Sequence, residues 1–234
     1  MTQNLNESFI VYRLRFADGQ SAEHTIALTE TPPTTEHAEW TRLGFHQCPN
    51  CPLSTEQVSH CPFATALEAP VRFLGERLSH TEVDVQVTHR GREIRQHTTL
   101  QRAVGSMLGA IGATSGCPHT AFLKAMAWFH QPFSDNDETL FRAIGTYLLG
   151  QHLRAMQGLP ADWSLIGLRE GYKNLRLINQ GIAKRLRSAA QEDSSVNGLI
   201  LLDLLASSAL NSLDQYEGEL DRYFSGYLPD QQHG

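Results

Sequence analysis

The sequence lacks an apolar run long enough to cross a membrane. Apolar runs such as Gly198 to Leu202 are interrupted, here by Asp203, whereas a membrane-spanning helix needs about 20 apolar residues. The first residues, MTQNLNESF, have neither the basic region nor the apolar region of a secretory signal. We therefore expect a cytoplasmic protein that does not associate with a membrane.

An excess of positive charge is also missing. The chain has 19 Lys and Arg against 25 Asp and Glu, which gives a formal net charge of -6 at pH 7. Nucleic acids and anionic membranes bind a local excess of Lys and Arg, so neither is expected as a partner. One basic stretch is an exception, and it comprises Arg169, Lys173, Arg176, Lys184, Arg185 and Arg187. Because few aromatic residues accompany it, we interpret it as a solvated helix face.

The motifs of several large enzyme classes are absent. We find no P-loop, no G-x-G-x-x-G after a strand, no G-x-S-x-G and no H-E-x-x-H. The acidic residues Asp135, Asp137 and Glu138 are typical of a helix N-terminus, which the helix dipole explains without catalysis. His130 is expected at a helix end, where an imidazolium would interact with the dipole. The sequence therefore leaves open whether the chain is an enzyme.

Two β-hairpins are predicted in the first 98 residues. SFIVYRLRF alternates, a turn follows at Asp18-Gly19, and SAEHTIAL returns as a second strand. Alternation in TEVDVQV, a turn at Arg90-Gly91 and a more polar edge strand give the second hairpin. The residues that share the predicted buried faces are Ile10, Tyr12, Leu14, Phe16, Ala22, His24, Ile26, Leu28, Val83, Val85 and Val87. Between the hairpins lies a Cys-rich connection, with a helical segment after Cys61 that Pro70 breaks or kinks.

From about residue 99 the spacing of apolar residues becomes helical. The predicted helical segments are 100–113, 121–130, 135–156, 162–190, 194–213 and 214–228. Leu199 to Leu213 is apolar nearly all round, so this helix is either central in a bundle or shared with another subunit. The fold class is therefore α+β, with a small antiparallel N-terminal sheet of two hairpins in residues 1–98 and a helical bundle in residues 99–234. We expect a homo-oligomer that associates through the helical part.

Each of the four cysteines, Cys48, Cys51, Cys61 and Cys117, is followed at once by proline. Only 10 of the 234 residues are Pro, so four Cys-Pro pairs have a cause other than chance. In Cys48-Pro49-Asn50-Cys51 the proline presets a turn that brings the two cysteines together. Pro62 and Pro118 suit the first position of a helix, which leaves Cys61 and Cys117 at the N-cap, where N–H groups favour an anionic sulfur.

Four thiolates suit a metal site better than a disulfide framework in a reducing compartment. They could hold zinc, with Zn–S distances of about 2.3 Å, or a [4Fe-4S] cluster, although their spacing differs from that of the ferredoxin run. Three alternatives remain: a thiol oxidoreductase centre at Cys48 and Cys51, a haem thiolate, and four ordinary buried cysteines. CPNC resembles the Cys-Pro-x-Cys centre of thioredoxin-like oxidoreductases, but Pro52 disfavours the helix start that this centre needs. The flanking His46, His60 and His119 could replace a cysteine or support the site.

Four segments, CPNCPL, HCPFA, SGCP and FHQPF, together resemble an uncharacterised family of bacterial proteins with a Cys-rich N-terminal part and a helical remainder. The resemblance implies no activity, substrate or cofactor, but it supports treating the four cysteines as one unit. We predict a metal-binding regulatory or scaffolding protein in which a four-cysteine zinc site joins the sheet region to the bundle. The alternative is an iron–sulfur redox protein or sensor that uses the same cysteines.

Overall fold

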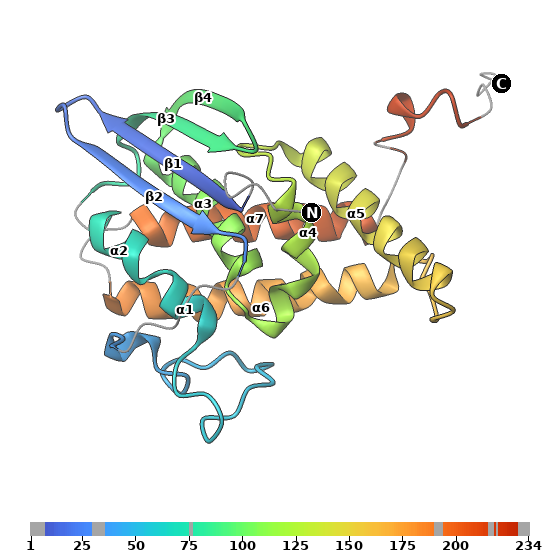
Figure 1. Cartoon of the computed structure of the whole chain (residues 1–234), viewed down its shortest axis with the longest axis horizontal. Helices are drawn as coiled ribbons and strands as arrows, with labels where there is room; N and C mark the ends of the chain where they lie inside the picture. The colour runs from blue at the N-terminus through green and yellow to red at the C-terminus, as the bar shows by residue number, and fades with distance from the viewer. Residues whose placement is uncertain are drawn as a thin grey trace.

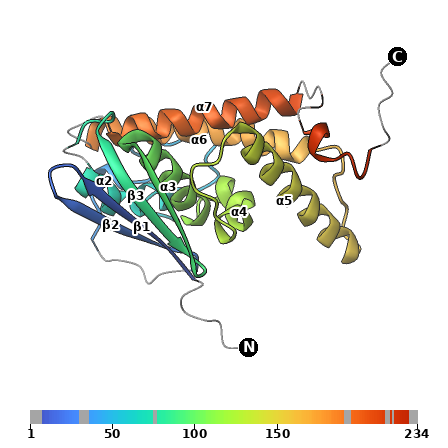
Figure 2. The same cartoon turned by 90° about the horizontal axis from the view of Figure 1, so that it is seen from above.

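A four-stranded antiparallel sheet packs against a set of helices, which confirms the predicted α+β class (Figures 1 and 2). The computed structural model describes residues 8–29, 36–74, 77–189, 194–214, 218 and 220–228. In the view of Figure 2, helix α3 (Leu100–Thr114) lies between the sheet and the long helices α6 (Ile166–Ala189) and α7 (Ser194–Asp214).

The sheet joins the two predicted hairpins. Its strands are β1 (Phe9–Phe16), β2 (Ser21–Ala27), β3 (Glu82–His89) and β4 (Arg92–Thr99), in the order β2-β1-β3-β4. Strands β1 and β3 pair antiparallel in the middle, with Leu14 opposite Val85. The polar strand β4 lies at an edge, as its sequence predicts, because an edge strand faces water along one side.

One face of the sheet is buried against α3. The alternate residues predicted for this face in β1 and β3 are all at most 4 % exposed: Ile10, Tyr12, Leu14, Phe16, Val83, Val85 and Val87. Helix α3 is apolar on several sides because it contacts the sheet on one side and α7 on another. The sheet and the helices therefore share one core.

In its described residues, the Cys-rich connection between the hairpins contains three short helices: η2 (Glu39–Thr41), α1 (Pro62–Ala66) and α2 (Glu68–Leu74). The predicted break occurs at Leu67, three residues before Pro70, because a proline has no N–H to bond back and its ring crowds the preceding turn. After α3, the 3₁₀ helix η3 (Pro118–Leu123) leads into α4 (Lys124–Trp128).

Helix α5 (Asn136–Met156) begins where the acidic residues predict a helix start. Asp135 and Glu138 form a capping box, in which each side chain accepts the backbone N–H of the other residue. Helix α7 packs against α3, α6 and α5. Its residues Ala206, Ala209 and Leu210 are buried, so this face of α7 packs inside the bundle.

The helix predicted over residues 214–228 is wrong for the described part of that segment. Only the 3₁₀ helix η4 (Asp221–Tyr223) forms there. Gly218 has a φ of 91°, which is outside the helical region. Leu220 is buried and the Phe224 ring lies 6.2 Å from that of Phe141 on α5, so part of the predicted apolar stripe packs on the bundle without being helical.

Candidate metal centre

The structure brings the four cysteines together from three separate segments. Cys61 is buried in the main core, and Cys48, Cys51 and Cys117 pack against that core. Burial raises the pKa of Cys48 to about 11, and the nearby thiols of Cys61, Cys51 and Cys117 add to this effect. Burial, with Cys61 and Cys51, likewise raises the pKa of Cys117. A negative charge on one sulfur would therefore raise the pKa of the neighbouring thiols.

Three of the four Cys-Pro pairs have the local geometry that the sequence predicts for them. In the turn of residues 48–51, the N–H of Cys51 donates to the carbonyl oxygen of Cys48 at 3.0 Å. Cys61 is the N-cap of α1 and Cys117 is the N-cap of η3, each with its proline in the first helical turn. The amides of His119 and Thr120 lower the pKa of Cys117 and so offset part of the effect of burial.

Asn50 fastens the Cys48–Cys51 turn to two other elements. Its side-chain amide donates to Asn174 on α6 at 2.9 Å. Its backbone carbonyl oxygen accepts a hydrogen bond from Nε2 of His119 on η3 at 2.6 Å. The turn is thus held against both the long helix and the segment that carries Cys117.

Helix α6 contacts Cys48 at Gly181. A Cβ atom added at Gly181 would lie 2.6 Å from Sγ of Cys48, closer than real carbon–sulfur contacts. Glycine is therefore required at this position if Cys48 is to keep its place beside the helix.

Arg185, one turn further along α6, is fully buried beside the cysteines. Its guanidinium donates to the carbonyl oxygens of Trp40, Arg42 and Leu43 at 2.7–2.9 Å, and its Nε has no hydrogen-bond partner. Among the described residues no carboxylate forms an ion pair with it. Burial lowers the pKa of Arg185, and Cys61, Cys48 and Cys51 act in the opposite direction. The titratable groups that act on Arg185 are thus the thiols of Cys61, Cys48 and Cys51.

The solvated basic face predicted for residues 169–187 is wrong at Arg185, which is 1 % exposed. Lys173, Lys184 and Arg187 are exposed as predicted. The helical spacing of Ile178, Ile182 and Arg185 is the signal that could have identified the arginine as buried, since residues at i, i+4 and i+7 share one face.

The histidines near the cysteines have other partners or face solvent. Nδ1 of His60 lies 2.8 Å from the Thr41 hydroxyl, His119 holds Asn50, and His46 is exposed. His130 does follow a helix end, but the imidazolium expected there is wrong: burial, together with Arg142 and His89, lowers its pKa to about 3.

Within the described ranges, no three or more His, Cys, Asp and Glu side chains form a group that could hold a metal ion. All four cysteines are free, so no disulfide joins them. The four-cysteine metal site at Cys48, Cys51, Cys61 and Cys117 stays a prediction. The described helices also include none with the length and apolar content of a membrane span.

A family model described as a domain of unknown function, DUF6901, matches residues 10–225. The chain belongs to this family. The match includes all four cysteines as well as Gly181 and Arg185, so the whole candidate centre lies inside the family domain. No curated protein and no solved structure matches the chain.

Proposed function

We propose that the chain is a metal-binding protein whose four cysteines hold a [4Fe-4S] cluster for a redox or sensing role in the cytoplasm. The observation that carries this proposal is Arg185, a buried cation with no described acidic partner beside four thiols. Buried charges in proteins are normally paired, because an isolated charge loses its hydration without compensation. A cluster or ion bound by four thiolates carries net negative charge and would supply the missing partner.

A cluster and a single ion require different spacings of the four sulfur atoms. At Zn–S distances of about 2.3 Å, four ligands of one zinc ion lie within about 4 Å of each other. A cubane cluster binds one thiolate at each of its four irons, so the four cysteine sulfurs lie further apart than those around a single ion. The four thiols influence one another's pKa but do not form a single-ion group.

Zinc is the second candidate. The turn that brings Cys48 and Cys51 together, with two residues between them, is typical of zinc ligands in structural sites. A zinc ion would have a scaffolding or regulatory role, because it would fasten the Cys-rich connection to the helical part. A thiol oxidoreductase is less well supported, since burial raises the pKa of Cys48 whereas reactive thiols of that class have a lowered pKa.

Protein purified without oxygen should contain about four iron and four sulfide per chain and absorb broadly near 400 nm. Cys61→Ser and Cys117→Ser should each lose this absorption. Ser188→Ala should retain it, because this exposed hydroxyl contacts only a carbonyl of its own helix. One zinc per chain without iron would reject the cluster in favour of the second candidate. Protein free of stoichiometric metal, with melting unaltered by the Cys→Ser changes, would reject both.

We also propose that the chain self-associates through the helical part, by a surface different from α7. Leu149, Leu153 and Met156 lie on one face of α5 and are 51–72 % exposed, and Trp163 and Ile166 nearby are more than half exposed. A second copy could cover this apolar surface. We expect a dimer in sedimentation at micromolar concentration, and a monomer for Leu153→Glu. Leu78→Glu, at an exposed leucine elsewhere, should remain dimeric; a monomeric wild type would contradict this proposal.

A further inference from the structure

A cavity of about 650 Å³ lies among α3, α4, α5, α6 and α7, lined by residues outside the cysteine site. Helix α3 leaves room for it because the residues it presents there are small: Gly105, Ser106, Gly109, Ala110 and Ala113. Leu123, Met126 and Leu175 add apolar walls. This size and character are typical of sites for small organic molecules.

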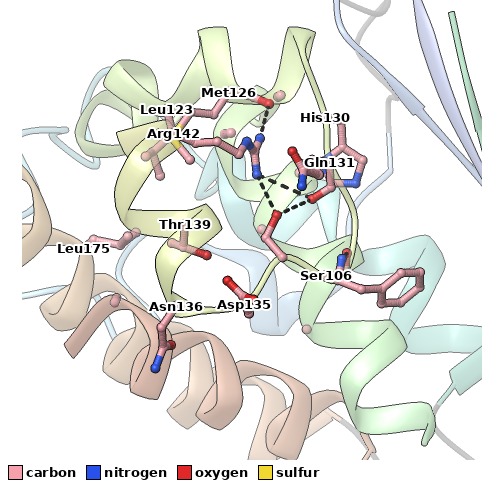
Figure 3. Close-up of a pocket in the computed structure, with 18 of the residues that line it drawn as sticks. Ser106, Leu123, Met126, His130, Gln131, Asp135, Asn136, Thr139, Arg142 and Leu175 are labelled. Carbon is pink, nitrogen blue, oxygen red and sulfur yellow. Dashed lines mark hydrogen bonds between the residues drawn. The ribbon is translucent and has the colours of Figure 1, made fainter. Parts of the chain in front are cut away.

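Arg142 of α5 brings a positive charge to this cavity. Its guanidinium donates to the carbonyl oxygen of Met126 at 2.9 Å and, over 3.3–3.4 Å, to the carbonyls of Phe129 and Gln131 and the hydroxyl of Ser134 (Figure 3). All these acceptors are neutral, and no described carboxylate pairs with Arg142. Its Nε–H has no acceptor among the described residues. The guanidinium therefore keeps its charge and one donor, the Nε–H, for a ligand.

The hydroxyl of Tyr172 is a second donor in the same wall. Tyr172 is 3 % exposed, burial raises its pKa to about 12, and Arg142 acts on it in the opposite direction, so the two groups are neighbours. The hydroxyl forms no hydrogen bond with another described residue. Because it is protonated at neutral pH and lines the cavity, it can donate to a bound molecule.

The other polar groups of the described lining do not neutralise the positive charge of Arg142. His130 is neutral, and its Nε2 lies 2.7 Å from the Tyr12 hydroxyl, which in turn contacts Ser106. Asp135 is the acidic member of the described lining, but it is exposed and its carboxylate already accepts the N–H of Glu138. Arg102 also lines the cavity but is exposed, and Glu138, one turn before Arg142, acts on Arg142 without forming an ion pair with it. A largely apolar cavity with the buried cation Arg142 fits an anion that has an apolar body.

We propose that this cavity binds a small monocarboxylate with an apolar or aromatic body. The carboxylate accepts hydrogen bonds from Arg142 and Tyr172, and the body lies among Leu123, Met126 and Leu175. The Nε–H of Arg142 and the hydroxyl of Tyr172 can each donate to one oxygen of a carboxylate, and one guanidinium with one phenol suits a single negative charge. The site is independent of the metal proposed at the cysteines.

Calorimetric titration with 2-naphthoate and its uncharged analogue 2-naphthamide tests the proposal on the full chain. We expect 2-naphthoate to bind at least about tenfold more tightly, because hydrogen bonds to a charged group are stronger than those to a neutral one. Tyr172→Phe should weaken binding of the carboxylate about tenfold and that of the amide much less. Tyr147→Phe is the matched control, since its hydroxyl bonds Asp162 outside the cavity, and it should change neither affinity.

Two further variants separate loss of the site from loss of the fold. Arg142→Gln should bring the affinities of the two probes together. Ala110→Leu should fill the cavity and prevent binding of both while the melting temperature stays the same or rises. Equal affinity of the wild type for both probes, no binding of either, or an unchanged 2-naphthoate affinity in Tyr172→Phe would overturn the proposal.

Discussion

Gly181→Ala is expected to remove stoichiometric metal from the chain while leaving the fold intact. The new Cβ would lie 2.6 Å from Sγ of Cys48, so the thiol must rotate away from its present place. In metal-free protein this rotation is cheap, because the sulfur is the end of a side chain; we expect the free energy of unfolding to change by about 1 kcal/mol or less. A metal group that loses one of its four ligands should bind at least about 100-fold more weakly.

Elemental analysis and circular dichroism of the same preparation measure both effects. Gly150→Ala on α5 is the matched control, since a Cβ there meets nothing within 4 Å. It should keep full metal content and gain slightly in stability, because alanine is the better helix former. Full metal content in Gly181→Ala would mean that Cys48 is not a ligand.

Arg185→Met is expected to lower the free energy of unfolding by about 3 kcal/mol or more. The substitution leaves the carbonyl oxygens of Trp40, Arg42 and Leu43 without the donor that satisfies them, and each orphaned buried acceptor costs about 1 kcal/mol or more. The segment of these carbonyls leads directly to Cys48, so the cysteines should lose their arrangement as well. Urea unfolding of metal-free protein gives the free energy, and metal analysis gives the second effect.

Arg185→Lys separates the charge of Arg185 from its hydrogen bonds. A lysine keeps the positive charge beside the thiols but cannot reach three carbonyls with one planar fork. We therefore expect it to be destabilised like the methionine variant, yet to retain more metal than that variant. Equal metal loss in both would show that the charge of Arg185 does not stabilise the bound group.

The regular elements follow from local patterns and could be predicted. Alternation along β1 and β3, with glycine turns after each, places Tyr12 and Val85 on the buried face. Helical spacing predicts α3, α5, α6 and α7, and the acidic residues at 135–138 identify where α5 begins. These features depend on neighbours in sequence, which is why one sequence suffices. The pairing of β1 with β3 depends on distant segments, and the hairpins alone do not specify it.

The remaining features depend on tertiary contacts that a local pattern does not encode. An apolar stripe over residues 220–228 indicates a helix, but Gly218 and the packing of Phe224 on Phe141 give a different backbone. Charge alone suggests that Arg185 is solvated. Its hydrogen bonds could not be predicted locally, because its three carbonyl acceptors come from residues more than 140 positions earlier. The cysteines were identifiable from their prolines. The cavity was not, since it arises from small residues on one helix and donors on two others.

Because α6 contacts the Cys48–Cys51 turn, the cysteines are synthesised well before the helix that holds them. The turn, Cys61 and Cys117 leave the ribosome well before Asn174 and Gly181, which contact the turn, and before Arg185, which holds the segment that leads into it. Such distant contacts form late, because closing a long loop costs entropy before any contact repays it. The thiols of a nascent chain therefore stay open to oxidants and to foreign metal ions until nearly two hundred residues have been translated.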